Sequence, residues 1–126
     1  MERENSKDNS ELTQILVELK NKGNFTGVIL AKRNGELINE NIEKPIDSKE
    51  FVSMCASVLE GANGLSETMR NQEVNKVITE LNEESIVIVK VNKNSFLICI
   101  LNEKSKSNLI LEHLDNFIHK IGSLSP

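Results

Sequence analysis

The stretch SIVIVKVNKNSFLICIL, residues 85–101, contains two apolar runs separated by Asn92, Lys93 and Asn94. The short polar segment between the runs is typical of a hairpin turn. Both runs are apolar at consecutive positions, whereas a strand with one wet face alternates apolar and polar residues. The stretch therefore predicts two central strands that need a covering layer on each face of their sheet.

A second hairpin is predicted just upstream, with strands at about 25–33 and 36–42. The pair Asn34-Gly35 is a strong hairpin signal, because a type I′ turn requires positive φ at both central residues. The run Val28–Ala31 is again apolar at consecutive positions, so the first of these strands is also expected to be covered on both faces.

The remaining strand and the helices complete the predicted order α-β-β-α-β-β-β-α. Residues 73–81 mix polar and apolar side chains, which favours an edge strand. Apolar periodicity predicts helices at 10–22, 48–70 and 106–121. The expected fold is α/β of the α+β type: a single five-stranded antiparallel sheet, with one long helix on one face and two on the other.

Helix boundaries come from capping residues. Ser10 is a candidate N-cap for the first helix, and Gly23 stands where a C′ residue is expected. Asp47 and Glu50 predict a capping box for the long helix, and Gly122 is expected to follow the last one. The domain is thus predicted to span 10–122, between a disordered leader, 1–9, and a short tail, 123–126.

The long helix carries two glycines, Gly61 and Gly64, each of which costs a helix interior about 1 kcal/mol relative to alanine. On a helical wheel, an apolar arc about 100° wide predicts the core-facing stripe. Its members are Phe51, Met54, Cys55, Val58, Ala62, Leu65 and Met69, widened by Val52 and Leu59. A lane of small residues runs beside it: Ser53, Ser57, Gly61, Gly64 and Thr68.

This small-residue lane has three possible interpretations. A lane of small side chains lets two backbones approach closely, so a second copy of the same helix is an economical partner. Alternatively, these are surface residues without a contact role. A phosphate-binding loop is disfavoured, because no strand precedes Gly61-Ala62-Asn63-Gly64 and no Gly-Lys-Ser/Thr ending follows it.

Composition narrows the function classes. The chain has 126 residues, a net charge of −4, no Trp, no Tyr and four Phe, so a nucleic-acid-binding surface is not expected. No signal peptide is visible, and no apolar run approaches the roughly 18 residues of a membrane span. Cys55 and Cys99 lie within apolar patterns, which favours buried reduced thiols over a disulfide or a reactive thiol. A cytoplasmic location is the resulting expectation.

No catalytic constellation emerges from the sequence, and neither a metal nor a cofactor is expected. HExxH, CxxC and GxSxG motifs are absent. His113 and His119 project from the last predicted helix about 120° apart, which does not suit one metal ion. Arg33 and Arg70 are candidate arginine fingers for GTP hydrolysis, although Arg70 also fits as a cation at a helix C-terminus.

Several of these segments together resemble the Roadblock/LC7 domain family, which includes roadblock-like dynein light chains and regulators of small GTPases. They are the element order, the hairpin GVILAKRNGELI, the helix CASVLEGANGLSETM and the pair SIVIVKVNKNSFLICIL. The resemblance covers about residues 10–122, and it depends on the combination because no single motif is diagnostic. The family's hairpin turn often carries Asp-Gly, where this chain has Asn34-Gly35.

The resemblance implies a non-catalytic homodimer, or a heterodimer with a second Roadblock protein. Family members pair their second helices antiparallel and join their third strands into one sheet. Carried onto this chain, the implied dimer surface is Ser53, Ser57, Gly61, Gly64, Thr68, Val74, Lys76 and Ile78. A small Ras-like GTPase would dock across the paired helices, and the residues expected to face it are Glu60, Glu67 and Arg70.

Two other functions stay open at this point. The chain could be a structural adaptor or light-chain-like subunit that binds its partners independently of nucleotide. It could also be a small-molecule sensor with a ligand between helix and sheet, which an internal cavity of ligand size would support.

Overall fold

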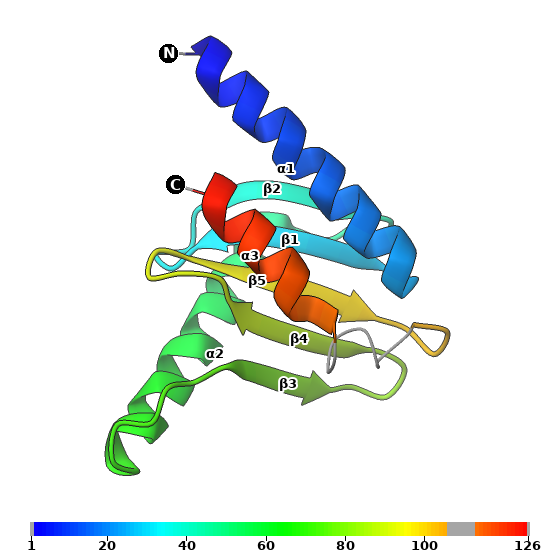
Figure 1. Cartoon of the computed structure of the whole chain (residues 1–126). Coiled ribbons are helices and arrows are strands. Elements are labelled where there is room, and N and C mark those ends of the chain that lie inside the picture. The colour runs from blue at the N-terminus through cyan, green and yellow to red at the C-terminus, as the bar shows by residue number, and fades with distance from the viewer. Residues whose placement is uncertain (1, 106–112, 126) are drawn as a thin grey trace.

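The computed structural model describes residues 2–105 and 113–125, with side chains described from Ser10 onward. Within this part of the chain, three helices and five strands follow each other in the predicted order (Figure 1). Their bounds are α1 Glu2–Gly23, β1 Gly27–Lys32, β2 Leu37–Ile42, α2 Ser48–Thr68, β3 Lys76–Glu80, β4 Ser85–Lys90, β5 Ser95–Leu101 and α3 Leu114–Leu124. The predicted fold class is confirmed.

The strands form one antiparallel sheet in the order β2-β1-β5-β4-β3. The centre is the pairing of β1 with β5, in which Ile29 lies opposite Ile98 and Leu30 opposite Leu97. Every residue of β5 is buried, as expected for a strand covered on both faces. β3 lies at one edge of the sheet, which also agrees with its polar pattern.

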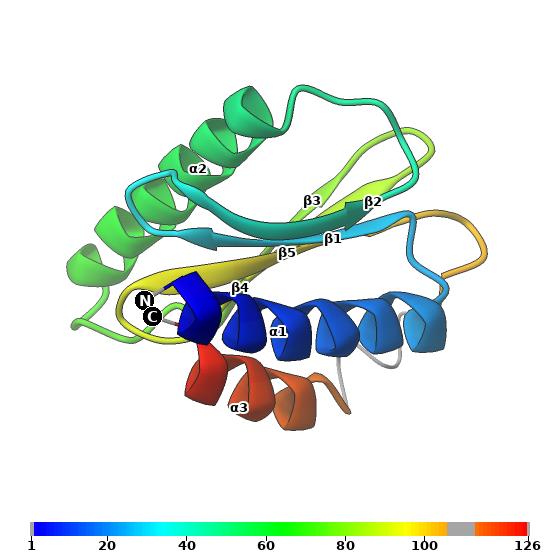
Figure 2. The ribbon, with the colours of Figure 1, turned by 90° about the horizontal axis from the view of Figure 1, so that it is seen from above.

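Helices cover both faces of the sheet, α2 on one side and α1 with α3 on the other (Figure 2). The core beneath α1 and α3 is the larger one, and the rows Leu12, Leu16, Leu19 and Leu114, Phe117, Ile121 pack into it. The core beneath α2 is smaller. Its buried members are Ile29, Ala31, Val52, Cys55, Leu59, Ile88, Phe96 and Ile98.

The helix termini differ from the predictions in two places. α1 begins at Glu2, so the backbone of 2–9 continues the helix where a disordered leader was expected. α3 continues to Leu124 and contains Gly122, which was expected to end the helix. A glycine within a helix is tolerated at modest cost, and here it packs against Val91. The predicted start of this helix, near 106, lies outside the described residues.

The turn between β1 and β2 is not the predicted type I′. Gly35 has φ +98°, but Asn34 is not among the residues with positive φ. The amide of Gly35 donates to the carbonyl of Lys32 at 2.9 Å, and the amide of Lys32 donates to the carbonyl of Glu36 at 2.7 Å. This pattern is a three-residue loop with glycine at the left-handed position. Asn34 contributes its side chain instead, because its Oδ1 accepts from the amide of Glu36 at 2.9 Å.

α2 begins at the predicted residue, with one of the two hydrogen bonds of the predicted capping box. Asp47 is the N-cap, and its Oδ1 accepts from the amide of Glu50 at 3.2 Å. This bond satisfies one of the backbone donors that a helix leaves unpaired at its first turn. The cap fixes where α2 begins.

The two cysteines are free and buried, as expected. Burial away from water raises the pKa of Cys55 from 9.0 to about 11, and that of Cys99 to about 12. The thiols are therefore protonated in the folded chain at neutral pH, and neither has the depressed pKa of a reactive cysteine.

Stability should consequently fall at alkaline pH. Above about pH 9 the thiols of the unfolded chain ionise while those of the folded chain stay protonated, so the contribution of Cys55 and Cys99 is complete below pH 9 and is lost as pH rises toward 11–12. Urea unfolding at pH 7.5, 9 and 10 measures this loss. The double variant Cys55→Ala/Cys99→Ala should show a shallower decline, and an identical decline would contradict the assignment.

Replacing Gly23 by a larger residue should disturb the packing around it. A Cβ at this position would lie 2.3 Å from Cζ of Phe25, which is buried in the larger core. We expect Gly23→Ala to lower the free energy of unfolding by about 1–3 kcal/mol, as overpacking does. In the matched control Gly122→Ala the new methyl meets Val91 at 3.6 Å, an ordinary contact. This change inside α3 should raise stability by about 0.5–1 kcal/mol.

Candidate interaction surface

The side of α2 that contacts the sheet differs from the predicted one. The buried residues of α2 are Val52, Cys55 and Leu59. Of these, Cys55 was a predicted member of the core-facing stripe, whereas Val52 and Leu59 were predicted only to widen it. On a wheel the observed contact is rotated by about 80° from the middle of the predicted stripe.

The rotation leaves an exposed apolar stripe along α2 and its last turn. The side chains of Met54 and Leu65 are 63% and 69% exposed, and Val58 and Met69 are also exposed. These four residues, called the outer stripe below, were all predicted to be core. Large exposed apolar side chains aligned along one helix indicate a contact with another molecule.

The small-residue lane lies directly beside the outer stripe. All five of its members, Ser53, Ser57, Gly61, Gly64 and Thr68, are exposed. A Cβ added at Gly61 or Gly64 would meet nothing within 4 Å in this chain. The glycines therefore serve no packing purpose among the described residues of the monomer, and space beside them is free for another backbone. The stripe and the lane together make a continuous exposed face along α2.

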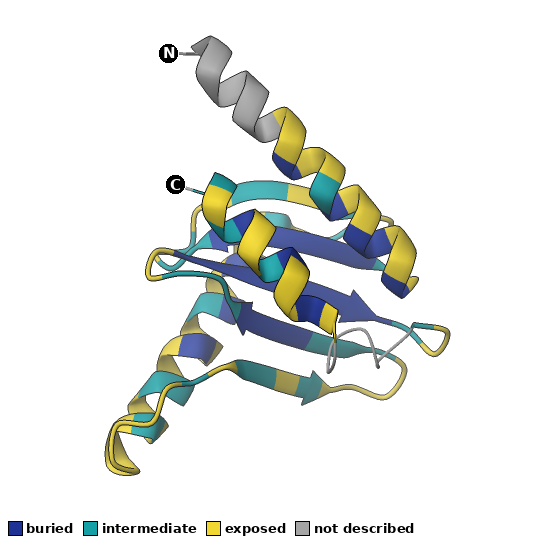
Figure 3. Cartoon of the chain, in the orientation of Figure 1, coloured by how far each residue is buried: buried dark blue, intermediate teal, exposed yellow. Residues whose placement is uncertain are grey.

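The second half of α2 has little support from its own chain. Beyond Leu59 the helix buries no residue, and its C-terminal turns extend past the edge of the sheet (Figures 1 and 3). The hydroxyls of Ser66 and Thr68 donate to backbone carbonyls within α2, Asn63 and Leu65, at 2.7 Å. This half of the helix is thus held mainly by its own hydrogen bonds.

The edge strand β3 and the segment just before it carry the remaining residues of the predicted dimer surface. It pairs with β4, and its outer edge faces no other strand among the described residues. Val74, just before β3, packs against the core beneath α2, as does Val77. Lys76 and Ile78 lie opposite Val89 and Val87, which belong to the core beneath α1 and α3. Of the predicted strand residues, Val74 therefore shares the side of α2, whereas Lys76 and Ile78 point to the other face of the sheet.

The residues expected to face a GTPase are all exposed, but they differ in their partners. Nη2 of Arg33 donates to Oε1 of Glu60 at 3.1 Å, so this predicted arginine-finger candidate is engaged with α2. Glu67 is exposed on the same side of the helix as Glu60. Arg70 follows the end of α2 with φ +66°, and Asn71 with φ +55°. Two consecutive non-glycine residues in the left-handed region carry backbone strain.

The two histidines of the last predicted helix are part of no metal site within the described part of the chain. His113 and His119 are both exposed. Among the described side chains, those of 10–105 and 113–125, no group of three or more His, Cys, Asp or Glu is arranged to hold a metal ion. None of the helices in the same ranges has the length and apolarity needed to cross a membrane.

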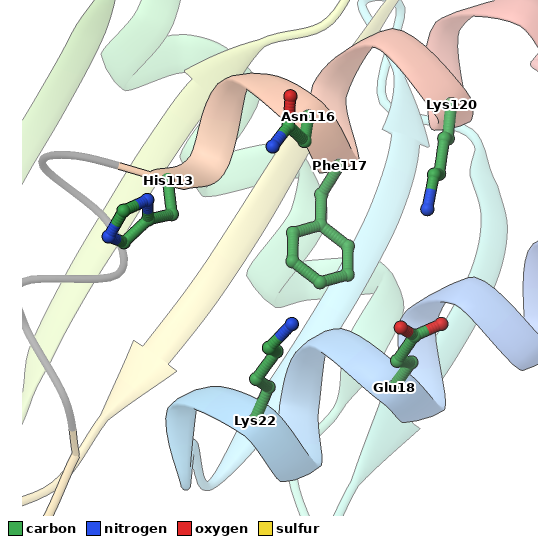
Figure 4. A pocket seen from close by; sticks show the side chains of 6 residues that line it. All are labelled: Glu18, Lys22, His113, Asn116, Phe117 and Lys120. Carbon is green, nitrogen blue, oxygen red and sulfur yellow. The ribbon is translucent and has the colours of Figure 1, made fainter.

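A hollow of about 320 Å³ lies away from α2, between α1 and α3 (Figure 4). Its lining includes Glu18, Asn116 and His113. The ammonium groups of Lys22 and Lys120 lie 5.9 and 6.0 Å from the ring centre of Phe117. Phe117 itself is buried in the core. Sequence patterns gave no signal for it, because it depends on how two helices distant in sequence meet.

Comparisons with known proteins agree on the fold. The family model described as Roadblock/LC7 domain matches residues 11–102. The structure of gliding protein MglB from Thermus thermophilus superimposes with a TM-score of 0.86 at 10% identity, covering 94% of this chain and 90% of that one. MglB from Myxococcus xanthus gives 0.84 at 19% identity, covering 94% and 92%. A structure described as MglB with tetrameric arrangement gives 0.87 at 11% identity, covering 94% and 90%. No curated protein sequence matches the chain.

The orientation of α2 can be tested with one substitution at two positions. Leu59 is buried and Leu65 is 69% exposed. Leu59→Ala should lower the free energy of unfolding by about 2–5 kcal/mol. Leu65→Ala should change it by less than about 0.5 kcal/mol. Urea unfolding at concentrations where sedimentation finds a monomer measures both. Equal losses of unfolding free energy, or a larger loss for Leu65→Ala, would contradict the observed orientation of α2 and support the predicted core-facing stripe.

Proposed function

Because this chain belongs to the Roadblock/LC7 domain family, we propose that it is a non-catalytic homodimeric binding module that scaffolds or regulates a small Ras-like GTPase. The observation that carries the proposal is the exposed face of α2, where the outer stripe and the small-residue lane run side by side. The proposed location is cytoplasmic, without insertion into a membrane and without a nucleic-acid partner.

The dimer forms by antiparallel pairing of two α2 helices around a two-fold axis. Such an interface presents the same patch from both protomers, so a stripe on one copy meets the stripe or lane of the other. Gly61 and Gly64 let the backbones approach, while Met54, Val58 and Leu65 lose their exposed apolar surface. Each Å² of apolar surface removed from water contributes roughly 25 cal/mol, which favours pairing of these faces.

The edge strand β3 extends the same contact. Its unpaired outer edge offers backbone donors and acceptors to the β3 of a second copy. Lys76 and Ile78 contribute to this pairing through their backbone, because their side chains lie on the face of the sheet away from α2. Val74 lies where the strand and the helix surfaces meet. A second Roadblock protein could take the place of one copy by the same geometry.

The GTPase docks across the paired helices. Glu60, Glu67 and Arg70 are exposed at the margin of the lane and at the end of α2, so they can contact a partner that the dimer holds. Arg33 is paired with Glu60, and we assign it the role of orienting that carboxylate. Regulation then acts on the conformation of the GTPase, without a catalytic group from this chain.

Gly61→Leu tests the dimer. A leucine side chain in the lane should separate the helices and shift the chain toward monomer by at least about tenfold in dissociation constant, which corresponds to about 1.4 kcal/mol. Sedimentation equilibrium measures the shift, and circular dichroism checks that the fold is kept. The control Gln14→Leu places the same side chain at an exposed position of α1, away from α2. An unchanged association of Gly61→Leu would exclude the lane as interface.

Binding of a GTPase is tested separately. Small Ras-like GTPases are the probes, loaded with GDP or a non-hydrolysable GTP analogue. We expect a complex with one nucleotide state preferred, weakened about three- to tenfold by Glu67→Lys or Arg70→Ala, since rim charges contribute modestly. A dimer that binds no GTPase in either state would leave the interface intact and reject this function.

Nucleotide-independent binding would instead favour the structural adaptor. The exposed face of α2 supports this alternative equally, because a docking surface does not by itself specify its partner. A sensor with a ligand between α2 and the sheet finds less support. Leu59, Phe96 and Ile98 are buried and packed together there.

A further inference from the structure

Two hairpin turns meet at one end of the sheet, the β1–β2 turn and the β4–β5 turn. The amide of Arg33 donates to the carbonyl of Asn94 at 2.8 Å, which ties one turn to the other. The second turn is organised by Asn92, whose Oδ1 accepts from the amides of Asn94 and Ser95 at 2.8 and 2.9 Å. The two turns therefore form one backbone unit with a defined surface between them.

A pocket of about 350 Å³ lies between these turns, and its lining contains no carboxylate. The lining residues are Lys32, Arg33, Asn34, Lys93 and Asn94. Three cationic side chains and two amides thus surround a volume at the lower end of the range for small-ligand sites. This composition contrasts with the net charge of −4 of the whole chain.

The cations of this pocket are available to an incoming anion. Lys32 pairs with Glu36 at 3.3 Å and Arg33 with Glu60 at 3.1 Å; the two cationic side chains are 40% and 29% exposed, and both carboxylate side chains are 66% exposed. Exposed pairs of this kind contribute little, so an anion of higher charge can replace them. Among the side chains that the structure describes, from Ser10 onward, no carboxylate lies within ion-pairing distance of Lys93.

The pocket lies at the positive end of a polarised sheet. Lys32, Lys76 and Lys90 each lie at the end of their strand that is nearest the two turns. The register shows this, because their partners are Ser95, Val89 and Phe96. At the opposite end Glu80, Glu83, Glu84 and Glu103 outnumber Lys44 and Lys104, and Lys44 is ion-paired with Glu84. Such a separation of charge focuses a positive potential on one end and draws anions to it.

We propose that the pocket between the β1–β2 and β4–β5 turns is an oxyanion site that takes a phosphate group, free or on a lipid headgroup. The guanidinium of Arg33 and the two lysines offer several donors. A phosphate has enough acceptor oxygens to bind them together, whereas a single carboxylate has only two. The hollow between α1 and α3 fits less well, because Glu18 lines it beside Lys22 and Lys120. The site adjoins α2 through the ion pair of Arg33 with Glu60, but its lining contains no residue of the outer stripe or of the small-residue lane, so it does not require dimerisation.

Inorganic phosphate is the first probe. In a titration followed by amide NMR, with chloride at equal ionic strength as reference, the amides of Arg33, Asn34, Lys93 and Asn94 should shift and saturate. Lys93→Gln should weaken binding about three- to tenfold, and Arg33→Gln/Lys93→Gln should abolish it. Lys104→Gln makes the same change of charge at the acidic end and should bind as the parent does.

Vesicles distinguish the source of the phosphate. Phosphatidylcholine vesicles containing phosphatidic acid are compared with pure phosphatidylcholine in co-sedimentation. A lipid headgroup is identified if the vesicles with phosphatidic acid retain the protein, Lys93→Gln loses this retention and inorganic phosphate binds weakly. A soluble ligand is identified if inorganic phosphate binds tightly and the vesicles do not retain the protein. No saturable shift together with no retention overturns the proposal, as does equal weakening by Lys104→Gln and Lys93→Gln.

Discussion

The antiparallel pairing of β1 with β5 is the constraint on which the rest of the structure depends. Both strands are apolar at consecutive positions, so neither can place a face in water. Ile29 and Ile98 lie on one side of this pair and Leu30 and Leu97 on the other. A single layer of helices would leave one of these rows exposed, and the chain must therefore supply a layer on each side. β2, β4 and β3 extend the sheet outward to edges with more polar strands.

The two covering layers use their apolar residues differently. α1 and α3 bury complete rows of large side chains against the sheet and against each other, and their exposed faces are polar apart from single residues such as Val17. α2 covers the opposite face with only Val52, Cys55 and Leu59 buried. The helix and the residue that follows it nevertheless carry four more large apolar side chains that are exposed. One layer is thus complete within the chain, whereas the other presents a surplus of apolar surface to the outside.

Much of the fold could be predicted from local patterns, because the element order follows from apolar runs, turn residues and caps. Asp47 fixes the start of α2 as expected. The failures have physical causes. The start of α1 at Glu2 was missed because residues 2–9 lack an apolar face, and a polar segment can continue a helix whose nucleus is packed elsewhere. The turn type at Asn34-Gly35 was missed because one glycine satisfies more than one loop geometry. The pocket between the two turns depends on strand order, which no local pattern reveals.

The rotation of α2 explains why the helical wheel found the apolar surface of this helix but assigned its outward half to the sheet. A wheel places the core at the middle of the apolar arc, which is correct when a helix has one apolar contact. The arc of α2 extends from Leu59 and Val52, which face the sheet, to Met54 and Leu65, which face outward. Its middle lies between the two directions, so the residues there were assigned to the sheet. When the apolar arc of a helix is wider than the part that its own sheet can cover, the pattern is the one expected for a helix with two contacts. Gly61 and Gly64 lie next to the outward half of that arc, where their missing side chains leave room for the second contact.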